Sequence, residues 1–268
     1  MHRDRLAFLG ILTAVAVAAV FLFVPPIPQD PTYHDLADER VILGIPRFGD
    51  VVSNFAFVLV GIAGMAALHR RRARSPDCPD AATMPLAVFF GGLALVGPAS
   101  AYYHWDPTTP TLFWDRLPMA IAFMALLAAV IADRVPGRWT NRSGLAVLVA
   151  LGVASVVYWS VGEAGGAGDL RFYGMVQFFA TALVPLILWL FPRREAAIEG
   201  RAIAAAFVLY ALAKSAEAFD QEIFALLGGS ISGHTMKHLL AAAAAVPLVQ
   251  SAMRRGASSL PPASAAPR

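Results

Sequence analysis

Two pairs of polar side chains with helical spacing stand out in an otherwise apolar chain. His234 and His238 are four residues apart, so both imidazoles project from one helix face, and Ser100 and His104 repeat this spacing. A third imidazole from another helix would complete three protein ligands for zinc and leave the fourth position open, as in catalytic zinc sites. The plainer alternative for an isolated H-x-x-x-H pair is two hydrogen-bonded histidines in a helical core.

A carboxylate belongs to the same set. Asp115 lies at the start of the apolar run that follows His104, and Arg116 comes directly after it. Taken singly, Ser100 is typical of a hydroxyl that bonds back to its own helix, and Asp115 with Arg116 is typical of a charge pair at a helix start. Ionisable groups inside membrane spans cost free energy to bury and usually have a function. The candidate residues are expected to lie at one membrane depth, which favours a metal site over unrelated structural roles. The full candidate set is Ser100, His104, Asp115, His234 and His238.

The elements that must position these residues are membrane-spanning helices. The chain of 268 residues is 58% hydrophobic and 15% charged, with a mean hydropathy of +0.62, whereas a soluble domain is about 45–50% apolar and about 25% charged. This composition excludes a disordered chain, a fibrous repeat and an ordinary cytosolic enzyme. A helix of about 20 apolar residues crosses the hydrocarbon core. Eight such runs fall at about 6–24, 51–68, 84–103, 112–132, 144–161, 172–191, 202–226 and 235–252.

We therefore predict an all-α polytopic transmembrane helix bundle, with a seven-helix core and one extra N-terminal helix, eight crossings in all. Residues 1–255 would form a single integral membrane domain, with the extra helix at 6–24 and the core at about 35–252. Residues 256–268, rich in Ala, Ser and Pro, would form a disordered cytoplasmic tail. The first run is too long for a usual signal peptide and ends in Val-Pro-Pro without an A-x-A site, so we expect it to be retained.

The distribution of arginines predicts the orientation of the bundle. Arginines cluster in alternate loops, which places those loops and both termini in the cytoplasm, most simply at the cell (inner) membrane, and the candidate site toward the outer face. The same clustering argues against nucleic-acid binding despite the net charge of +3, because the arginines do not share one soluble face. The clustered arginines are Arg3, Arg5, Arg70, Arg71, Arg72, Arg74, Arg134, Arg138, Arg142, Arg193, Arg194, Arg201, Arg254 and Arg255.

Two further polar regions lie toward the predicted outer face. The loop 25–50 is acidic and too long for a simple connector, so it is a candidate functional loop. In the seventh run, Lys214 and Glu217 are three residues apart and can pair inside the bundle, either as a structural ion pair or as a contact to a substrate headgroup.

These motifs together resemble the alkaline ceramidase family. The resemblance rests on Ser100-x3-His104-x10-Asp115, on the terminal His234-x3-His238, and on the segment 50–54, Asp-Val-Val-Ser-Asn, which is similar to the family's Asn-Thr-Val-Ser-Asn. It covers roughly residues 35–252. The family belongs to a superfamily of seven-helix membrane hydrolases that also includes adiponectin receptors and a GPI-lipid remodelling branch.

The resemblance implies zinc ligation by His104, His234 and His238, proton transfer by Asp115, and binding of the amide carbonyl by Ser100. The implied activity is a zinc-dependent intramembrane amidase that hydrolyses the N-acyl amide of a ceramide-like membrane lipid to a fatty acid and a long-chain amine, through a metal-bound hydroxide. Two alternatives stay open. One is a lipid esterase or phospholipase on the same zinc site, and the other is a non-catalytic, receptor-like membrane protein with a structural zinc.

Calcium is a doubtful cofactor for this chain. Eukaryotic members of the family bind calcium in an acidic segment before the first core helix, and Asp35 and Asp38 resemble part of it. Arg40 and Arg47 stand where further oxygen ligands would be expected, and calcium requires several oxygen ligands. Our hypothesis is that arginine–carboxylate pairs replace calcium structurally here.

Overall fold

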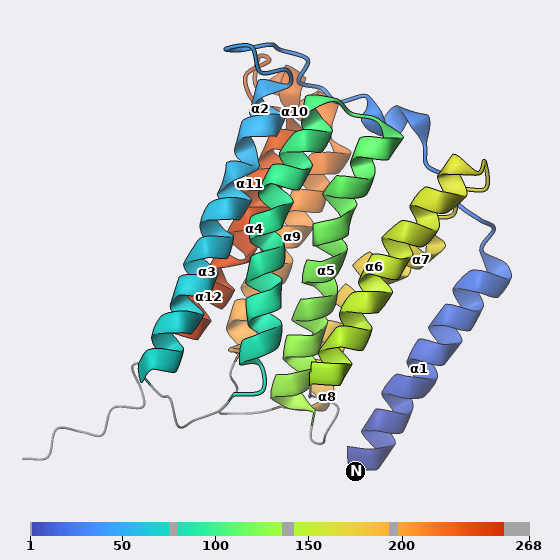
Figure 1. Cartoon of the computed structure of the whole chain (residues 1–268), viewed down its shortest axis with the longest axis vertical. Coiled ribbons are helices and arrows are strands. Elements are labelled where there is room, and N and C mark those ends of the chain that lie inside the picture. Colours follow the sequence, from blue (N-terminus) through green and yellow to red (C-terminus); the bar gives the residue numbers. More distant parts are fainter. Residues whose placement is uncertain (1, 75–79, 136–141, 193–197, 255–268) are drawn as a thin grey trace, which may run out of the picture.

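The computed structural model describes residues 2–74, 80–135, 142–192 and 198–254. These residues fold into helices joined by loops, with no β-strand among them beyond an isolated bridge between Ile42 and Ile45 (Figure 1). The predicted all-α polytopic bundle is confirmed. The predicted tail at 256–268 lies outside the described residues, as do Arg138, Arg193, Arg194 and Arg255.

Within the described residues, six helical stretches are long and apolar enough to cross a membrane, or seven if one bent pair counts as a single span. They are α1 (His2–Phe23), α2 (Phe48–Ser53) continued by α3 (Phe55–Arg74), α4 (Thr83–Trp105), α5 (Thr109–Arg134), α6 (Arg142–Ala164), and α7 (Arg171–Gly174) continued by the π-helical turn η3 (Met175–Phe179) and α8 (Ala180–Leu190). The bent pair is α9 (Gly200–Ala218) with α10 (Asp220–Leu226). The short 3-10 helix η1 (Pro31–His34), α11 (Gly233–Ala244) and α12 (Val246–Arg254) complete the fold.

The seventh apolar run, expected as one helix over 202–226, is instead broken and turned by 82° between α9 and α10. Phe219 leaves the helical conformation at φ −111° and ψ 36°. The next residue, Asp220, accepts hydrogen bonds from the backbone N–H of Ala37 at 2.9 Å and of His234 at 2.7 Å. These partners hold the polar end of the run at the end of the bundle, so α10 lies across it.

The eighth run, expected over 235–252, is also two helices. The chain turns at Ala245, and Pro247 follows in the first turn of α12, where its missing N–H costs no helical hydrogen bond. The pair α11 and α12 is not among the stretches that qualify as spans by length and composition. Eight crossings were expected, and six or seven stretches qualify.

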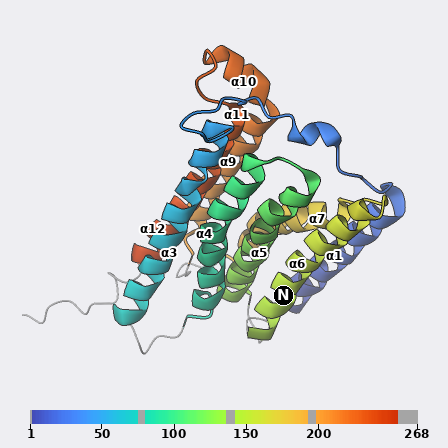
Figure 2. The ribbon, with the colours of Figure 1, turned by 45° about the horizontal axis from the view of Figure 1, so that its top comes forward.

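The bundle places α4 between α3 and α5, with α11 packed against α9 and α3 (Figure 1). The expected extra N-terminal helix is α1, which lies outside the bundle beside α6 and α7 and buries none of its residues (Figures 1 and 2). A few contacts hold its two ends, among them stacking of His2 on Phe191 and of Arg171 on the ring of Phe21. Arg5 donates to the carbonyl of Leu190 at 2.6 Å, and Arg171 donates to the carbonyl of Val24 at 2.7 Å.

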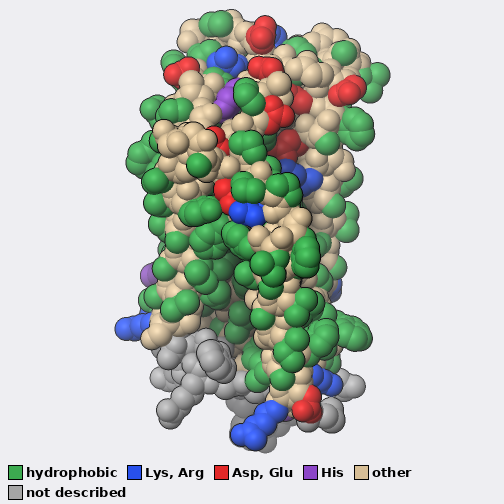
Figure 3. Space-filling model, turned by 90° about the vertical axis from the view of Figure 1, so that its right-hand side faces the viewer, with side chains coloured by type: hydrophobic (Ala, Val, Ile, Leu, Met, Phe, Trp, Pro, Cys, Tyr) green, Lys and Arg blue, Asp and Glu red, His purple; other side chains and the backbone are tan. Residues whose placement is uncertain are grey.

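The two ends of the bundle differ in chemistry. We call the end that contains the last turns of α4 and the first turns of α5 and α11 the site end. The arginine-rich termini of α1, α3, α5 and α12 lie at the opposite end (Figure 1). Hydrophobic side chains cover a broad band of the face seen in Figure 3, and charged side chains gather above and below it. This distribution is typical of a protein embedded in a bilayer.

Candidate metal centre

The five predicted site residues lie together at the site end. Ser100 and His104 occupy the last two turns of α4, Asp115 the second turn of α5, and His234 and His238 the first turns of α11. All five side chains are buried. The helices bring residues from distant parts of the sequence to one depth, as the sequence predicted.

The three histidines form a group that can hold a metal ion. One nitrogen from each ring lies within 4.8 Å of the others, and the ring centroids are 4.7 to 4.9 Å apart. Nitrogen ligands of a tetrahedral zinc at about 2.0–2.1 Å lie roughly 3.4 Å from one another. A bound ion would therefore draw the farthest nitrogens closer, which small rotations of the rings can supply.

Unpaired nitrogens support the fit to a metal. Both ring nitrogens of His104 and Nε2 of His238 are buried and have no hydrogen-bond partner among the described residues. Buried polar atoms are nearly always hydrogen-bonded, because leaving one unpaired costs about 1–3 kcal/mol. A metal ion among the three rings would satisfy Nε2 of His238 and one nitrogen of His104, whereas the plainer alternative of hydrogen-bonded core histidines leaves both unexplained.

The Ser53 hydroxyl favours one tautomer of His238. Ser53 Oγ donates to the carbonyl of Asp50 at 3.2 Å and lies 2.9 Å from Nδ1 of His238. A hydroxyl has one proton, so once it is given to Asp50 the serine oxygen can only accept from Nδ1–H. Nε2 then carries a free lone pair, and it is the nitrogen left unpaired. An imidazole that donates through one nitrogen and offers the other is typical of metal ligands.

The third histidine has a competing neighbour. Nζ of Lys237 lies 2.8 Å from Nε2 of His234, and it also pairs with Glu217 at 3.0 Å. Glu217 in turn pairs with Lys214, as the i, i+3 spacing predicted. A metal ion that used Nε2 of His234 would have to replace the lysine contact. Sequence reasoning gave Lys237 no role, although its position one turn after His234 was a signal that it faces the same side.

Asp115 and Ser100 face an adjacent cavity. The Ser100 hydroxyl is within hydrogen-bonding reach of the Asp115 carboxylate. Both residues line a cavity of about 720 Å³, together with His238. Its remaining walls are mostly apolar side chains of α1, α4, α5, η3, α8, α9 and α11. The size falls within the about 300–1,000 Å³ that is typical of small-molecule sites.

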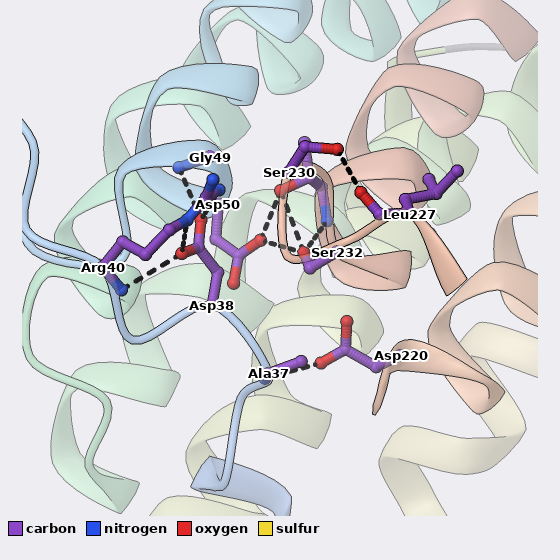
Figure 4. A network of polar contacts seen from close by, with 10 residues as sticks. Ala37, Asp38, Arg40, Gly49, Asp50, Asp220, Leu227, Ser230 and Ser232 are labelled. Atoms are coloured by element: carbon purple, nitrogen blue, oxygen red, sulfur yellow. Dashed lines mark hydrogen bonds and ion pairs between the residues drawn. The ribbon is translucent and has the colours of Figure 1, made fainter. Parts of the chain in front are cut away.

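The start of α11 is fixed by a buried polar cluster. Ser232 caps the helix by accepting from the N–H of Thr235 at 2.8 Å, and both hydroxyls donate to the Asp50 carboxylate, at 2.7 and 2.6 Å (Figure 4). Gly233 permits the close approach of α11 to α9, because a Cβ there would lie 2.2 Å from the carbonyl oxygen of Ala216. These contacts fix the positions of the His234 and His238 imidazoles.

An ion pair between Arg40 and Asp38 holds the acidic loop, which agrees with part of the hypothesis of arginine–carboxylate pairs. Arg40 binds both carboxylate oxygens of Asp38 through Nε at 2.7 Å and Nη2 at 2.8 Å, and the Gly49 N–H donates to the same carboxylate at 2.9 Å (Figure 4). Burial acts to raise the pKa of Asp38, but these hydrogen bonds outweigh it and hold that pKa below its usual value. The hypothesis is wrong for Arg47, which contacts the backbone carbonyl of Trp105 at 3.5 Å, and Asp35 is exposed.

Comparisons of the chain with family models, with curated proteins and with solved structures found no match. The candidate metal centre therefore stands on its own geometry, as three buried imidazoles beside an apolar cavity that also contains a serine and an aspartate.

Proposed function

We propose that this protein is a zinc-dependent intramembrane hydrolase that cleaves the N-acyl amide of a membrane lipid. One observation carries the proposal. Three buried histidines, two of which have unpaired ring nitrogens, adjoin a largely apolar cavity that also contains Ser100 and Asp115. A zinc ion held by three imidazoles supplies a Lewis acid and activates water as a nucleophile at neutral pH.

The residues around the centre suit amide hydrolysis. Water adds to the amide carbonyl carbon and the carbon–nitrogen bond breaks, giving a fatty acid and an amine. Asp115 would take the proton from the attacking water on a carboxylate oxygen and deliver it to the departing nitrogen, which cannot leave as an anion. The Ser100 hydroxyl would donate to the carbonyl oxygen as negative charge develops on it. A purely structural zinc needs neither group.

The cavity suits a lipid. Its walls deep in the bundle include Phe89, Leu93, Phe123, Leu126 and Val184, which offer an apolar surface for an acyl chain. Ser100 and Asp115 line it at the site end, so a chain inserted between the helices would bring its amide toward the histidines. By the arginine distribution, that end faces the outer side of the cell membrane.

The test is a measurement of zinc content and hydrolysis on one purified preparation in lipid nanodiscs. The substrates are a ceramide, a simple N-acyl amine and a phosphatidylcholine with matched acyl chains. We expect bound zinc and release of fatty acid from the amides. Cleavage of phosphatidylcholine alone would identify an esterase instead, and zinc without hydrolysis of any lipid would indicate a structural ion.

Variants separate the roles of the residues. We expect Asp115→Asn to lower kcat by about 100- to 10,000-fold, the usual contribution of general acid–base catalysis, while zinc remains bound. Asp35→Asn, at an exposed carboxylate of the same end, is the matched control and should keep full activity. His238→Ala should lose zinc and hydrolysis together. Full hydrolysis after loss of zinc would rule out the zinc mechanism.

A further inference from the structure

Arg116 is buried and forms no ion pair with any described residue. It follows Asp115 in the second turn of α5 and is only 6% exposed. Its side chain makes no ion pair and no hydrogen bond to any residue in the described parts of the chain, and Nη1 is fully buried. Asp115 lies within electrostatic range of both Arg116 and the Ser100 hydroxyl, but it forms no ion pair with Arg116. A buried unpaired guanidinium is costly, so its retention calls for a partner.

Three aromatic rings surround the guanidinium. Its Cζ lies 4.2 Å from the ring centroid of Trp159, 4.9 Å from that of Tyr173 and 5.5 Å from that of Tyr33. Cation–π contacts stabilise the charge through the face of the group, but they leave its in-plane N–H donors without acceptors. Nε1 of Trp159 is likewise buried with no hydrogen-bond partner among the described residues. Two neighbouring donors thus lack an acceptor.

Arg116 differs from the other cations that line the cavity. It shares the cavity wall with Asp115 and Ser100, and with Gln29 and Tyr33 of the loop at the site end. The other lining cations in the described part of the chain each pair with a carboxylate. These pairs are Arg171 with Asp169, and Lys214 and Lys237 with Glu217. The unpaired positive charge therefore sits where the cavity meets the site-end loop.

We propose that Arg116 binds an anionic headgroup, a carboxylate or a phosphate, of the lipid that occupies this cavity. The planar guanidinium can donate two parallel hydrogen bonds to such a group, and the aromatic cage holds it in position for this. The preferred substrate of the site is then an acidic lipid amide, which is hydrolysed more efficiently than a neutral amide such as a ceramide. That last step rests on the proposed hydrolase function, whereas the binding of the anionic headgroup does not.

The binding test uses two probes that contain no amide. Hexadecyl phosphate and hexadecanol have the same chain and differ in headgroup charge, and their binding to the full-length protein in phosphatidylcholine nanodiscs is followed by tryptophan fluorescence. Trp159 lies beside Arg116 and reports on the site. We expect the wild-type protein to bind the phosphate probe at least about tenfold more tightly than the alcohol, because a charge-assisted hydrogen-bonded pair raises the affinity by about that factor. Inorganic phosphate at millimolar concentration should not displace the probe, and displacement would overturn the assignment to a lipid.

Arg116→Gln is expected to weaken binding of hexadecyl phosphate by about 10- to 100-fold and to leave hexadecanol unchanged. Arg201→Gln removes an exposed arginine at the opposite end and should change neither. Arg116→Lys keeps the charge but loses the paired donors, so it should retain a reduced preference for the phosphate. This second variant decides the matter if Arg116→Gln does not fold.

Equal binding of the two probes by the wild-type protein would refute the assignment, and so would an unchanged preference in folded Arg116→Gln. Neither result bears on hydrolysis, and a failure to hydrolyse any amide leaves the binding test intact. If both proposals hold, N-palmitoylglycine should be hydrolysed with a higher kcat/KM than N-palmitoylethanolamine. Arg116→Gln should remove that difference.

Discussion

Removing the Ser53 hydroxyl tests whether His238 is a metal ligand with a fixed orientation. In the wild-type protein Ser53 Oγ lies 2.9 Å from Nδ1 of His238, and a serine oxygen that accepts from Nδ1–H leaves Nε2 free for a metal. Ser53→Ala removes this acceptor without adding atoms. Loss of such an orienting contact usually lowers metal affinity by 10- to 100-fold, that is about 1.4 to 2.7 kcal/mol.

The structure indicates that Ser53→Ala lowers the zinc affinity by an amount at the low end of this range. The backbone carbonyl of Asp50 also lies within hydrogen-bonding reach of the His238 ring and can take over part of the role of the hydroxyl. We therefore expect about a tenfold rise in the zinc dissociation constant, or roughly 1.4 kcal/mol. The assay is a competition titration against a chelator of known zinc affinity, on purified protein in detergent.

The matched control is Ser155→Ala. Ser155 is also a buried helical serine, and its hydroxyl donates to the Gly152 carbonyl at 2.7 Å, but α6 contributes no ligand. It should leave zinc affinity unchanged. If Ser53→Ala binds zinc as tightly as the wild-type protein while both variants fold, then Ser53 does not orient His238 and the tautomer argument is wrong.

Three other outcomes are expected. Protein stripped of metal and reloaded with zinc alone should hydrolyse lipid at the full rate without calcium, because Arg40 and Gly49 already donate hydrogen bonds to both oxygens of the Asp38 carboxylate. A calcium requirement in that assay would contradict this expectation. Hydrogen bonds from Arg171 lower the pKa of Asp169 to about 2, so this pair stabilises the fold by about 2 kcal/mol above pH 4 and loses that contribution as the pH falls from 4 to 2. Asp169→Asn should show the loss as a lower Tm at neutral pH but not near pH 2. Gly233→Ala should cost about 1–3 kcal/mol in thermal unfolding because of its contact with Ala216, whereas Gly91→Ala, which meets nothing within 4 Å, should cost nothing.

Much of the fold could be predicted because the signals are local. A run of about 20 apolar residues must be helical in lipid, since each backbone group must find its partner within the same segment. The spacing of His234 and His238 within one helix follows from the helical period alone. The breaks near Phe219 and Ala245 were missed, and the first depends on Ala37, which is far away in the sequence.

The sequence by itself determined the class of the protein, the helices and the five polar residues that can form a site. The convergence of His104 with the α11 histidines was expected from topology, but its geometry depends on how α4 packs beside α3 and α11, which no local pattern encodes. Only the tertiary structure distinguished Arg116 from the paired cations of the cavity. Whether a charge is paired is decided by partners that folding brings near, and the residues around Arg116 come from three separate segments of the chain.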